Sequence, residues 1–346
     1  QTLQTATILV KKNGFDRKEI ATIRRFCDER QFDPIYFPGI TPQDLGRYQV
    51  VPGQPHARAF SQIVSPQGKE SFYDDYPFDV SPTSDDRPFF FHFFRWQPAG
   101  EALRLWGKVW LPFGGAGYLV LVALLLLVTV ASVVLVIIPL LAGRFLQKEK
   151  GVPPSDAQRA NKLLPPWKTL IYFGALGLGY LFVEIPLMQR FILFLGQPTY
   201  SFALVLSTVL VCSGLGSLVS RQWTTHALPT LGLLSVFALL YPLMLPVAFD
   251  AWLGHPLHLR LLASVGMIAP LSFLMGIPFP LGIRLLGESS PSLIPWAWAI
   301  NGCASVMSSI IAAMVALSLG FAWVLMLAGL SYGVGLAVIY PLLRRS

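Results

Sequence analysis

The stretch GGAGYLVLVALLLLVTVASVVLVIIPLLA, residues 114–142, contains no charged side chain and is closed by Arg144. About 20 apolar residues are enough for a helix to cross the hydrocarbon core of a bilayer. Six further apolar runs follow, and we expect each of them to form a transmembrane helix: residues 169–188, 201–219, 228–249, 260–286, 296–319 and 322–343. The sequence therefore predicts a mainly α, polytopic membrane helix bundle with about seven transmembrane helices.

The distribution of charge separates the two ends of the chain. Only 13% of the 346 residues are charged, about half of what a soluble domain usually carries. Residues 1–111 contain 14 Lys/Arg and 13 Asp/Glu, whereas residues 112–346 contain 12 and 5. The net charge of +8 falls in loops between apolar runs. It indicates membrane orientation rather than nucleic-acid binding, so the expected partner is the lipid bilayer.

The same loops predict an orientation. Most Lys and Arg lie in the loops after the first, third and fifth runs and at the C-terminus, while the other loops carry only Arg190 and Arg260. Positive loops remain in the cytoplasm. We therefore expect the loop 144–168 and the C-terminus to be cytoplasmic, and the N-terminal soluble segment to be periplasmic or extracellular.

The N-terminal segment has the pattern of a strand, a helix and a second strand. ATILVKKNGF, residues 6–15, is a short apolar run that ends in a turn signal, and DPIYFPG, residues 33–39, is a second strand candidate. Between them, Asp16 and Glu19 can form a capping box at the start of a helix. We expect an α/β segment that is the last part of a larger sheet. Because the chain opens directly on a strand, we expect it to be a piece of a longer protein.

Three regions follow from these patterns. Residues 1–98 form the predicted soluble α/β segment, and residues 114–343 form the transmembrane domain. Residues 99–113 form an interfacial linker, in which Trp106 and Trp110 have the aromatic composition of a membrane boundary.

Glu184 is the one acidic residue within an apolar run. A membrane-buried carboxylate is costly, so it should face the bundle and have a partner. Gln189 and Arg190 follow on the same helix, and the kink expected at Pro186 could bring either of them closer; another helix could also supply the partner. Two interpretations are open: part of a substrate or proton path, or a structural bond between helices.

The fifth run is interrupted by Pro278 and Pro280. Broken helices line cavities in transporters, but a kink can also be stabilised by neighbouring helices that satisfy its free carbonyls. Asn301 opens a face of small residues in the sixth run, and SGLGS, residues 213–217, provides another in the third. Both indicate close helix packing.

Two further groups contain residue types that can bind ligands. Asp85, Asp86 and Arg87 could bind a cationic ligand or form a turn with a local ion pair. His255 and His258 have no third or fourth ligand nearby, so no metal site is expected.

Several stretches together resemble one family. VEIPLMQRFILFLGQPTYSFALVLSTVLVCSGLGS, residues 183–217, is similar to the membrane repeat of bacterial spermidine synthase-like membrane proteins. The matching positions are Glu184, Arg190, Leu195, Gly196, Tyr200 and Gly214 to Ser217. The helix that starts at Asn301, the stretch MGIPFPLGIR and DDRPFFF, residues 85–91, also resemble family segments.

The resemblance implies a bacterial inner-membrane protein in which helices are fused to a Rossmann-like, class I methyltransferase-type domain. An S-adenosyl-type cofactor is implied by the resemblance alone, and the motifs that would bind it lie earlier in the family than the residues of this chain. The implied function is a membrane-embedded aminopropyl- or methyltransferase-like protein, acting on a polyamine or a membrane-associated substrate, whose catalytic half is not in this chain.

Two other functions compete with the transferase. One is a non-catalytic subunit or scaffold that binds other membrane subunits or the missing N-terminal part of the same protein. The other is a transporter, for which the candidate intramembrane polar site consists of Glu184, Gln189, Arg190, Tyr200 and Asn301.

The orientation predicts the accessibility of two tags. A tag inserted at residue 60 should be labelled from the periplasmic side of intact cells, because seven spans place it opposite the C-terminus. A tag at the C-terminus should be labelled only after the cells are opened. Cytoplasmic labelling of both tags would show that the number of spans is wrong.

Overall fold

The computed structural model describes most of the chain, in residues 7–48, 53–65, 68–76, 78–95, 116–149, 165–222 and 227–343. The predicted linker 99–113, with Trp106 and Trp110, lies outside the described residues. The chain forms two compact units, which are Gln1–Ser81 with Arg95–Val109, and Pro82–Phe94 with Trp110–Ser346. We call them the N-terminal unit and the membrane unit.

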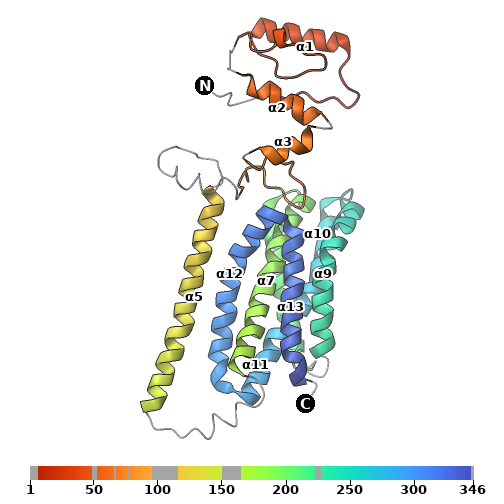
Figure 1. The fold of residues 1–346 in the computed structure, drawn as a ribbon. Coiled ribbons are helices and arrows are strands. Elements are labelled where there is room, and N and C mark those ends of the chain that lie inside the picture. The colour runs from red at the N-terminus through yellow and green to blue at the C-terminus, as the bar shows by residue number, and fades with distance from the viewer. Residues whose placement is uncertain are drawn as a thin grey trace. The chain divides into compact units, whose positions relative to one another are not determined.

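The membrane unit is built from long helices (Figure 1). They are α5 (Ala116–Glu149), α7 (Pro166–Leu195), α8 (Pro198–Val219), α9 (Ala227–Trp252), α10 (Leu257–Met275), α11 (Pro278–Ser289), α12 (Ile294–Leu319) and α13 (Phe321–Leu343), with a 3-10 helix at Pro291–Leu293. Among the described residues, seven helical stretches are long and apolar enough to cross a membrane, and α10 with α11 counts as one of them. The seven predicted spans are therefore confirmed.

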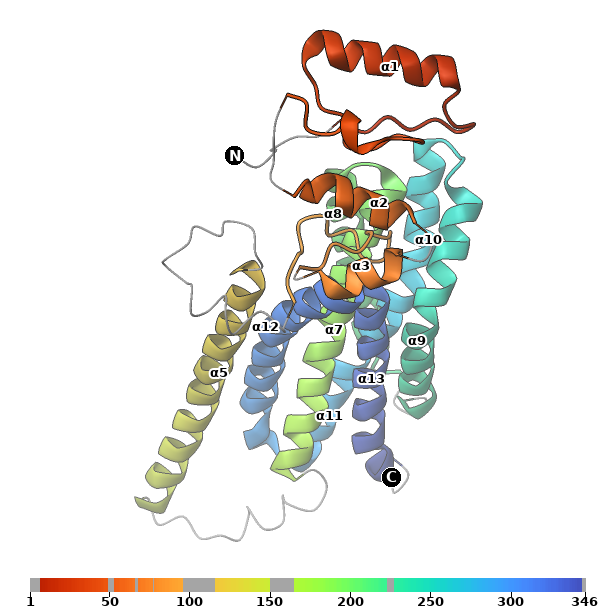
Figure 2. The ribbon, with the colours of Figure 1, turned by 45° about the horizontal axis from the view of Figure 1, so that its top comes forward.

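Helix α7 is the centre of the membrane unit. It contacts α8, α10, α11, α12 and α13, and α12 and α13 lie on either side of it in Figures 1 and 2. In its most apolar stretch, 61% of the residues are buried in the protein, against 6% for α5. The rings of Tyr172, Phe173 and Phe191 are fully buried. Apolar burial among the helices thus converges on α7, while few of the side chains described for α5, in residues 117–136, are buried.

Helices α8 and α10 cross at very short range. A Cβ atom added to Gly216 would lie 2.0 Å from the backbone oxygen of Phe273, and one added to Gly276 would lie 1.9 Å from that of Ser213. Only glycine allows the two backbones to approach this closely. The packing role predicted for residues 213–217 is confirmed.

The predicted break in the fifth span separates α10, which ends at Met275, from α11, which begins at Pro278. Proline has no backbone N–H, so Pro278 and Pro280 reduce the number of unpaired donors in the first turn of α11. The Tyr172 hydroxyl of α7 donates a hydrogen bond of 2.7 Å to the Pro278 carbonyl. This contact favours a kink that is stabilised by neighbouring helices.

The N-terminal unit differs from the sequence prediction. Its described residues contain helices α1 (Arg17–Arg30), α2 (Pro55–Val64) and α3 (Lys69–Asp75) and a 3-10 helix at Pro42–Asp44, but no strand. The α/β segment with strands at 6–15 and 33–39 is therefore wrong for the residues described. The side chains of Ile8, Leu9 and Val10 are mostly exposed, and no described strand pairs with their backbone. An apolar run without a neighbouring strand has no ladder to join.

The helix expected after Asp16 is present and has the predicted capping box. Glu19 N donates to Asp16 Oδ1 at 2.8 Å, and Asp16 N donates to Glu19 Oε2 at 2.9 Å. Two of the free donors at the start of α1 are thereby satisfied.

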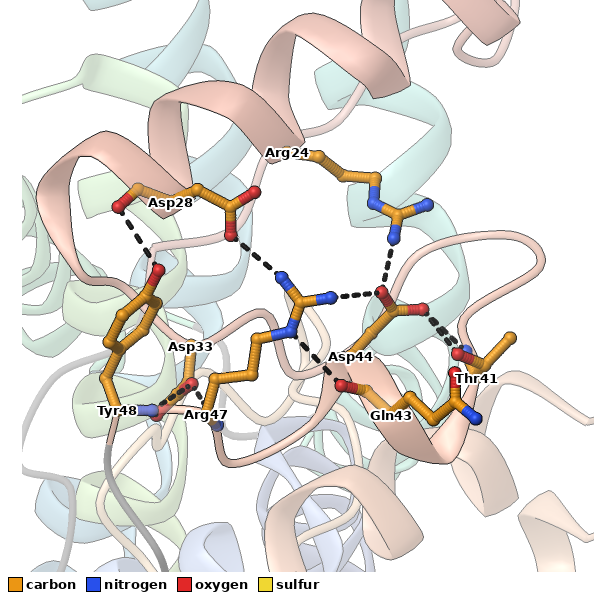
Figure 3. A network of polar contacts seen from close by, with 8 residues as sticks. All are labelled: Arg24, Asp28, Asp33, Thr41, Gln43, Asp44, Arg47 and Tyr48. Atoms are coloured by element: carbon orange, nitrogen blue, oxygen red, sulfur yellow. Dashed lines mark hydrogen bonds and ion pairs between the residues drawn. The ribbon is translucent and has the colours of Figure 1, made fainter.

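A polar network fixes α1 to the 3-10 helix that follows it (Figure 3). Asp44 accepts hydrogen bonds from the hydroxyl and the backbone N–H of Thr41, at 2.7 and 3.0 Å. Its carboxylate also pairs with Arg24 of α1 and with Arg47. These contacts, above all the Thr41 hydroxyl, hold the pKa of Asp44 below its ordinary value.

The lowered pKa predicts an acid-sensitive N-terminal unit. Because the folded state binds this proton less tightly than the unfolded state, Asp44 stabilises the unit above its unfolded pKa of about 3.8. That contribution is lost as the pH falls through the lower, folded value. In the full chain, the protection factors of the α1 amides, which correct for the slower intrinsic exchange at low pH, should therefore fall between pH 6 and pH 3.

The variant D44N should exchange faster at pH 6 and show less of this acid-dependent change. The variant E29Q, which alters an exposed acid on α1, serves as the control. Equal behaviour of the two variants would contradict the role of Asp44.

Candidate functional site

A short segment of the membrane unit, Pro82–Phe94, lies against the end of the helix bundle. Within it, Arg87 N donates to the Ser84 carbonyl at 2.9 Å, which closes a tight turn. Asp85 is exposed, whereas Asp86 and Arg87 are partly buried. The turn therefore leaves one acid in solvent and directs the next toward the helices.

The Asp86 side chain binds two different helices, α7 and α13. Its carboxylate pairs with the guanidinium of Arg190 on α7, and Oδ1 accepts a hydrogen bond of 2.9 Å from Ala322 N at the start of α13. The Asp86 carbonyl accepts a second bond, of 3.0 Å, from Phe321 N. A carboxylate at a helix N-terminus is stabilised both by the free N–H groups and by the helix dipole.

The backbone of Gly320 makes room for this contact. Gly320 has φ +99°, and a Cβ atom there would lie 2.3 Å from Asp86 Oδ2. A side chain at this position would therefore strain the backbone and displace the carboxylate.

The neighbours of Asp86 extend the contact to α12. Arg87 Nε donates to the Leu317 carbonyl at 2.8 Å, near the C-terminus of that helix. The rings of Phe89 and Phe321 lie 5.5 Å apart. We call Asp86, Arg87 and Phe89, with the groups they contact on α7, α12 and α13, the Asp86 clamp.

The same segment also contacts α5. The rings of Phe94 and Tyr118 are stacked 4.7 Å apart. The Tyr118 hydroxyl lies 3.1 Å from Ser318 Oγ of α12, so α5 is linked to the bundle at the same place.

The five residues of the predicted intramembrane site do not form one group. Arg190 is paired with Asp86, Gln189 and Tyr200 are exposed, and Asn301 donates to the Phe173 carbonyl at 3.1 Å. The Asn301 contact joins α12 to α7. Glu184 is buried, with 6% of its surface exposed, and forms no hydrogen bond or ion pair with the described residues.

Sequence reasoning did not connect two other side chains with this part of α7. Tyr180 lies one turn before Glu184, and the Tyr332 ring of α13 lies against Gly179, where an added Cβ atom would be 3.0 Å from Cζ of the ring. The four-residue spacing from Tyr180 to Glu184 was a usable signal, since such residues share a helix face. Nothing in the local sequence connects Tyr332 to them.

Comparison with known proteins adds no assignment: no family model, no curated protein and no solved structure matches this chain. Within the described part of the chain, no group of three or more His, Cys, Asp or Glu residues could hold a metal ion.

Removal of the Asp86 carboxylate should destabilise the membrane unit. The variant D86A leaves Arg190 without its partner and the first turn of α13 without its cap. We expect a loss of about 3 kcal/mol, the low end for a broken buried pair because Asp86 is partly exposed. The variant D86N keeps a cap acceptor and should lose less.

The measurement is the free energy of unfolding in detergent, with D85A as the matched control. This substitution of the exposed neighbouring acid should change the value by less than about 0.5 kcal/mol. Equal losses for D85A and D86A would refute the clamp.

Proposed function

We propose that this chain is the membrane domain of a larger, spermidine synthase-like transferase, and that it anchors the catalytic part of that protein without supplying catalytic residues. The observation that carries the proposal is the Asp86 clamp. The chain passes from the N-terminal unit into the segment Pro82–Phe94 and back again at Arg95. That segment is bound to α7, α12 and α13.

The motif positions of the family resemblance support an architectural role. Arg190 is the clamp residue of α7, Gly216 lies at the close crossing of α8 and α10, and Asn301 joins α12 to α7. Gly196 ends α7 in the left-handed conformation, with φ +80°. These positions determine how the helices pack and end, which is what an anchoring domain requires.

The proposed location is the inner membrane of a bacterium. The N-terminal unit is placed on the periplasmic side and the C-terminus in the cytoplasm, on the basis of the positively charged loops. S-adenosyl cofactors are cytoplasmic, so the orientation decides between the two candidate functions. An active transferase requires the N-terminal unit in the cytoplasm, whereas a periplasmic unit would leave the second candidate, a non-catalytic scaffold.

The proposal is tested by measuring cofactor binding to the complete gene product, purified from native membranes in detergent. A transferase should bind S-adenosylmethionine or its decarboxylated form. It should also contain, before Gln1, a glycine-rich loop after a strand and an acidic residue about 20 positions later. Substitution of that loop should abolish binding while the protein stays in the membrane fraction. A gene product that lacks the motif and binds neither compound would refute the transferase and favour the non-catalytic scaffold.

A further inference from the structure

A second tight turn follows the first in the segment Pro82–Phe94, and we call it the phenylalanine turn. His92 N donates to the Phe89 carbonyl at 3.2 Å, so Phe90 and Phe91 occupy the two central positions. Phe90 is 71% exposed and Phe91 is 84% exposed. Glycine, proline, asparagine, aspartate and serine are the usual residues of a turn. Two adjacent phenylalanines at its tip therefore form an apolar surface where polar side chains are the norm.

Ring contacts hold the phenylalanine turn at both of its ends. At the start, Phe89 packs against Phe321, the first residue of α13, with ring centroids 5.5 Å apart. At the end, the His92 ring lies 5.6 Å from the Tyr118 ring of α5. The two exposed rings are thus carried by a turn whose ends are already fixed. Little further ordering is needed for them to bind a partner.

The same contacts place the turn at one boundary of the membrane-spanning region. Phe89 contacts the first residue of the span Phe321–Pro341, and His92 contacts the second residue of the span Gly117–Val136. The turn is therefore level with the ends of two spans. At this level a chain that crosses a bilayer meets the headgroup layer.

The side chains at the tip favour lipid as the partner. Phenylalanine has neither a charge nor a hydrogen-bonding group, so Phe90 and Phe91 gain from leaving water and have no polar group to satisfy. Membrane-surface elements use Trp, Phe and Leu to enter the boundary between headgroups and acyl chains. The preceding turn, Ser84–Arg87, has the opposite character, since its exposed residue is Asp85.

We infer that Phe90 and Phe91 insert into the lipid bilayer at the boundary between headgroups and acyl chains. The segment Pro82–Phe94 is then bound to the membrane surface as well as to the helices. Because the tip is uncharged, this contact is insensitive to salt and to the charge of the headgroups. The inference requires only that the chain spans a membrane, so it goes beyond the proposed function and does not rest on it.

The experiment locates a fluorescent label on the full chain in nanodiscs of phosphatidylcholine. The three cysteines of the chain are replaced by alanine, and F90C is labelled with nitrobenzoxadiazole. D85C is the matched control, because Asp85 is the second residue of the turn Ser84–Arg87 as Phe90 is of the phenylalanine turn. Two quenchers are compared, a nitroxide on the lipid acyl chain near the headgroup and iodide in the water.

The lipid nitroxide should quench labelled F90C at least about threefold more strongly than labelled D85C, because half-burial of the remaining Phe91 ring favours the inserted state by roughly that factor. Iodide should quench the two labels in the reverse order. Adding F91S to F90C should lower the lipid quenching. Salt and anionic phosphatidylglycerol should leave it unchanged, since no charge takes part in the contact.

Three outcomes would overturn the inference. Equal and weak lipid quenching at the two positions, with strong iodide quenching, would place the tip in water. A label on F90C that neither quencher reaches would show that protein covers the tip. Lipid quenching that F91S leaves unchanged would show that the label inserts by its own affinity.

A second measurement decides the question if the cysteine-free chain does not fold. Phe91 is replaced by the photoreactive p-benzoylphenylalanine in the chain that keeps its cysteines, and the same replacement at Asp85 is the control. Irradiation in the nanodiscs should attach lipid to the first protein and not to the second. Attachment to protein instead, or no more lipid than at Asp85, would overturn the inference.

Discussion

The pairing of Asp86 with Arg190 is the interaction on which the arrangement of the membrane unit depends. Arg190 is nine-tenths buried near the end of the central helix, and a charge in that position has to be compensated. The compensating residue also caps α13, and its neighbours bind the end of α12. A short segment outside the spans thus fixes the mutual position of three helices, at the end where α12 and α13 are joined.

The polar groups within the bundle fall into two kinds. Asn301, Ser305 and Ser308 of α12 donate hydrogen bonds to carbonyl groups of α7 and thereby hold the two helices together. Glu184 and Tyr332 have no such partner among the described residues. Polar groups of the first kind need no further explanation, because hydrogen bonds between helices stabilise their packing in a bilayer. The second kind retains a cost that packing does not remove.

The sequence was most informative where local chemistry decides the structure. Seven spans, the break at Pro278 and the cap of Asp16 were predictable because each depends on nearby residues. The strands failed because an apolar run such as residues 6–15 becomes a strand only beside another strand. The partner of Arg190 lies 104 residues earlier in the chain, so helical spacing could not reveal this pair. The pair is a product of tertiary packing.

The distance along the chain between the two halves of the clamp sets an order for its assembly during synthesis. Ala322 follows Asp86 by 236 residues, which a ribosome takes roughly 10–50 s to add. Throughout that interval the segment Pro82–Phe94 has emerged while one of its binding surfaces does not yet exist. A chain interrupted before α13 would keep Asp86 without its final helix terminus. Closure of the clamp is therefore an event that only a fully translated membrane unit can undergo, and it separates finished molecules from incomplete ones.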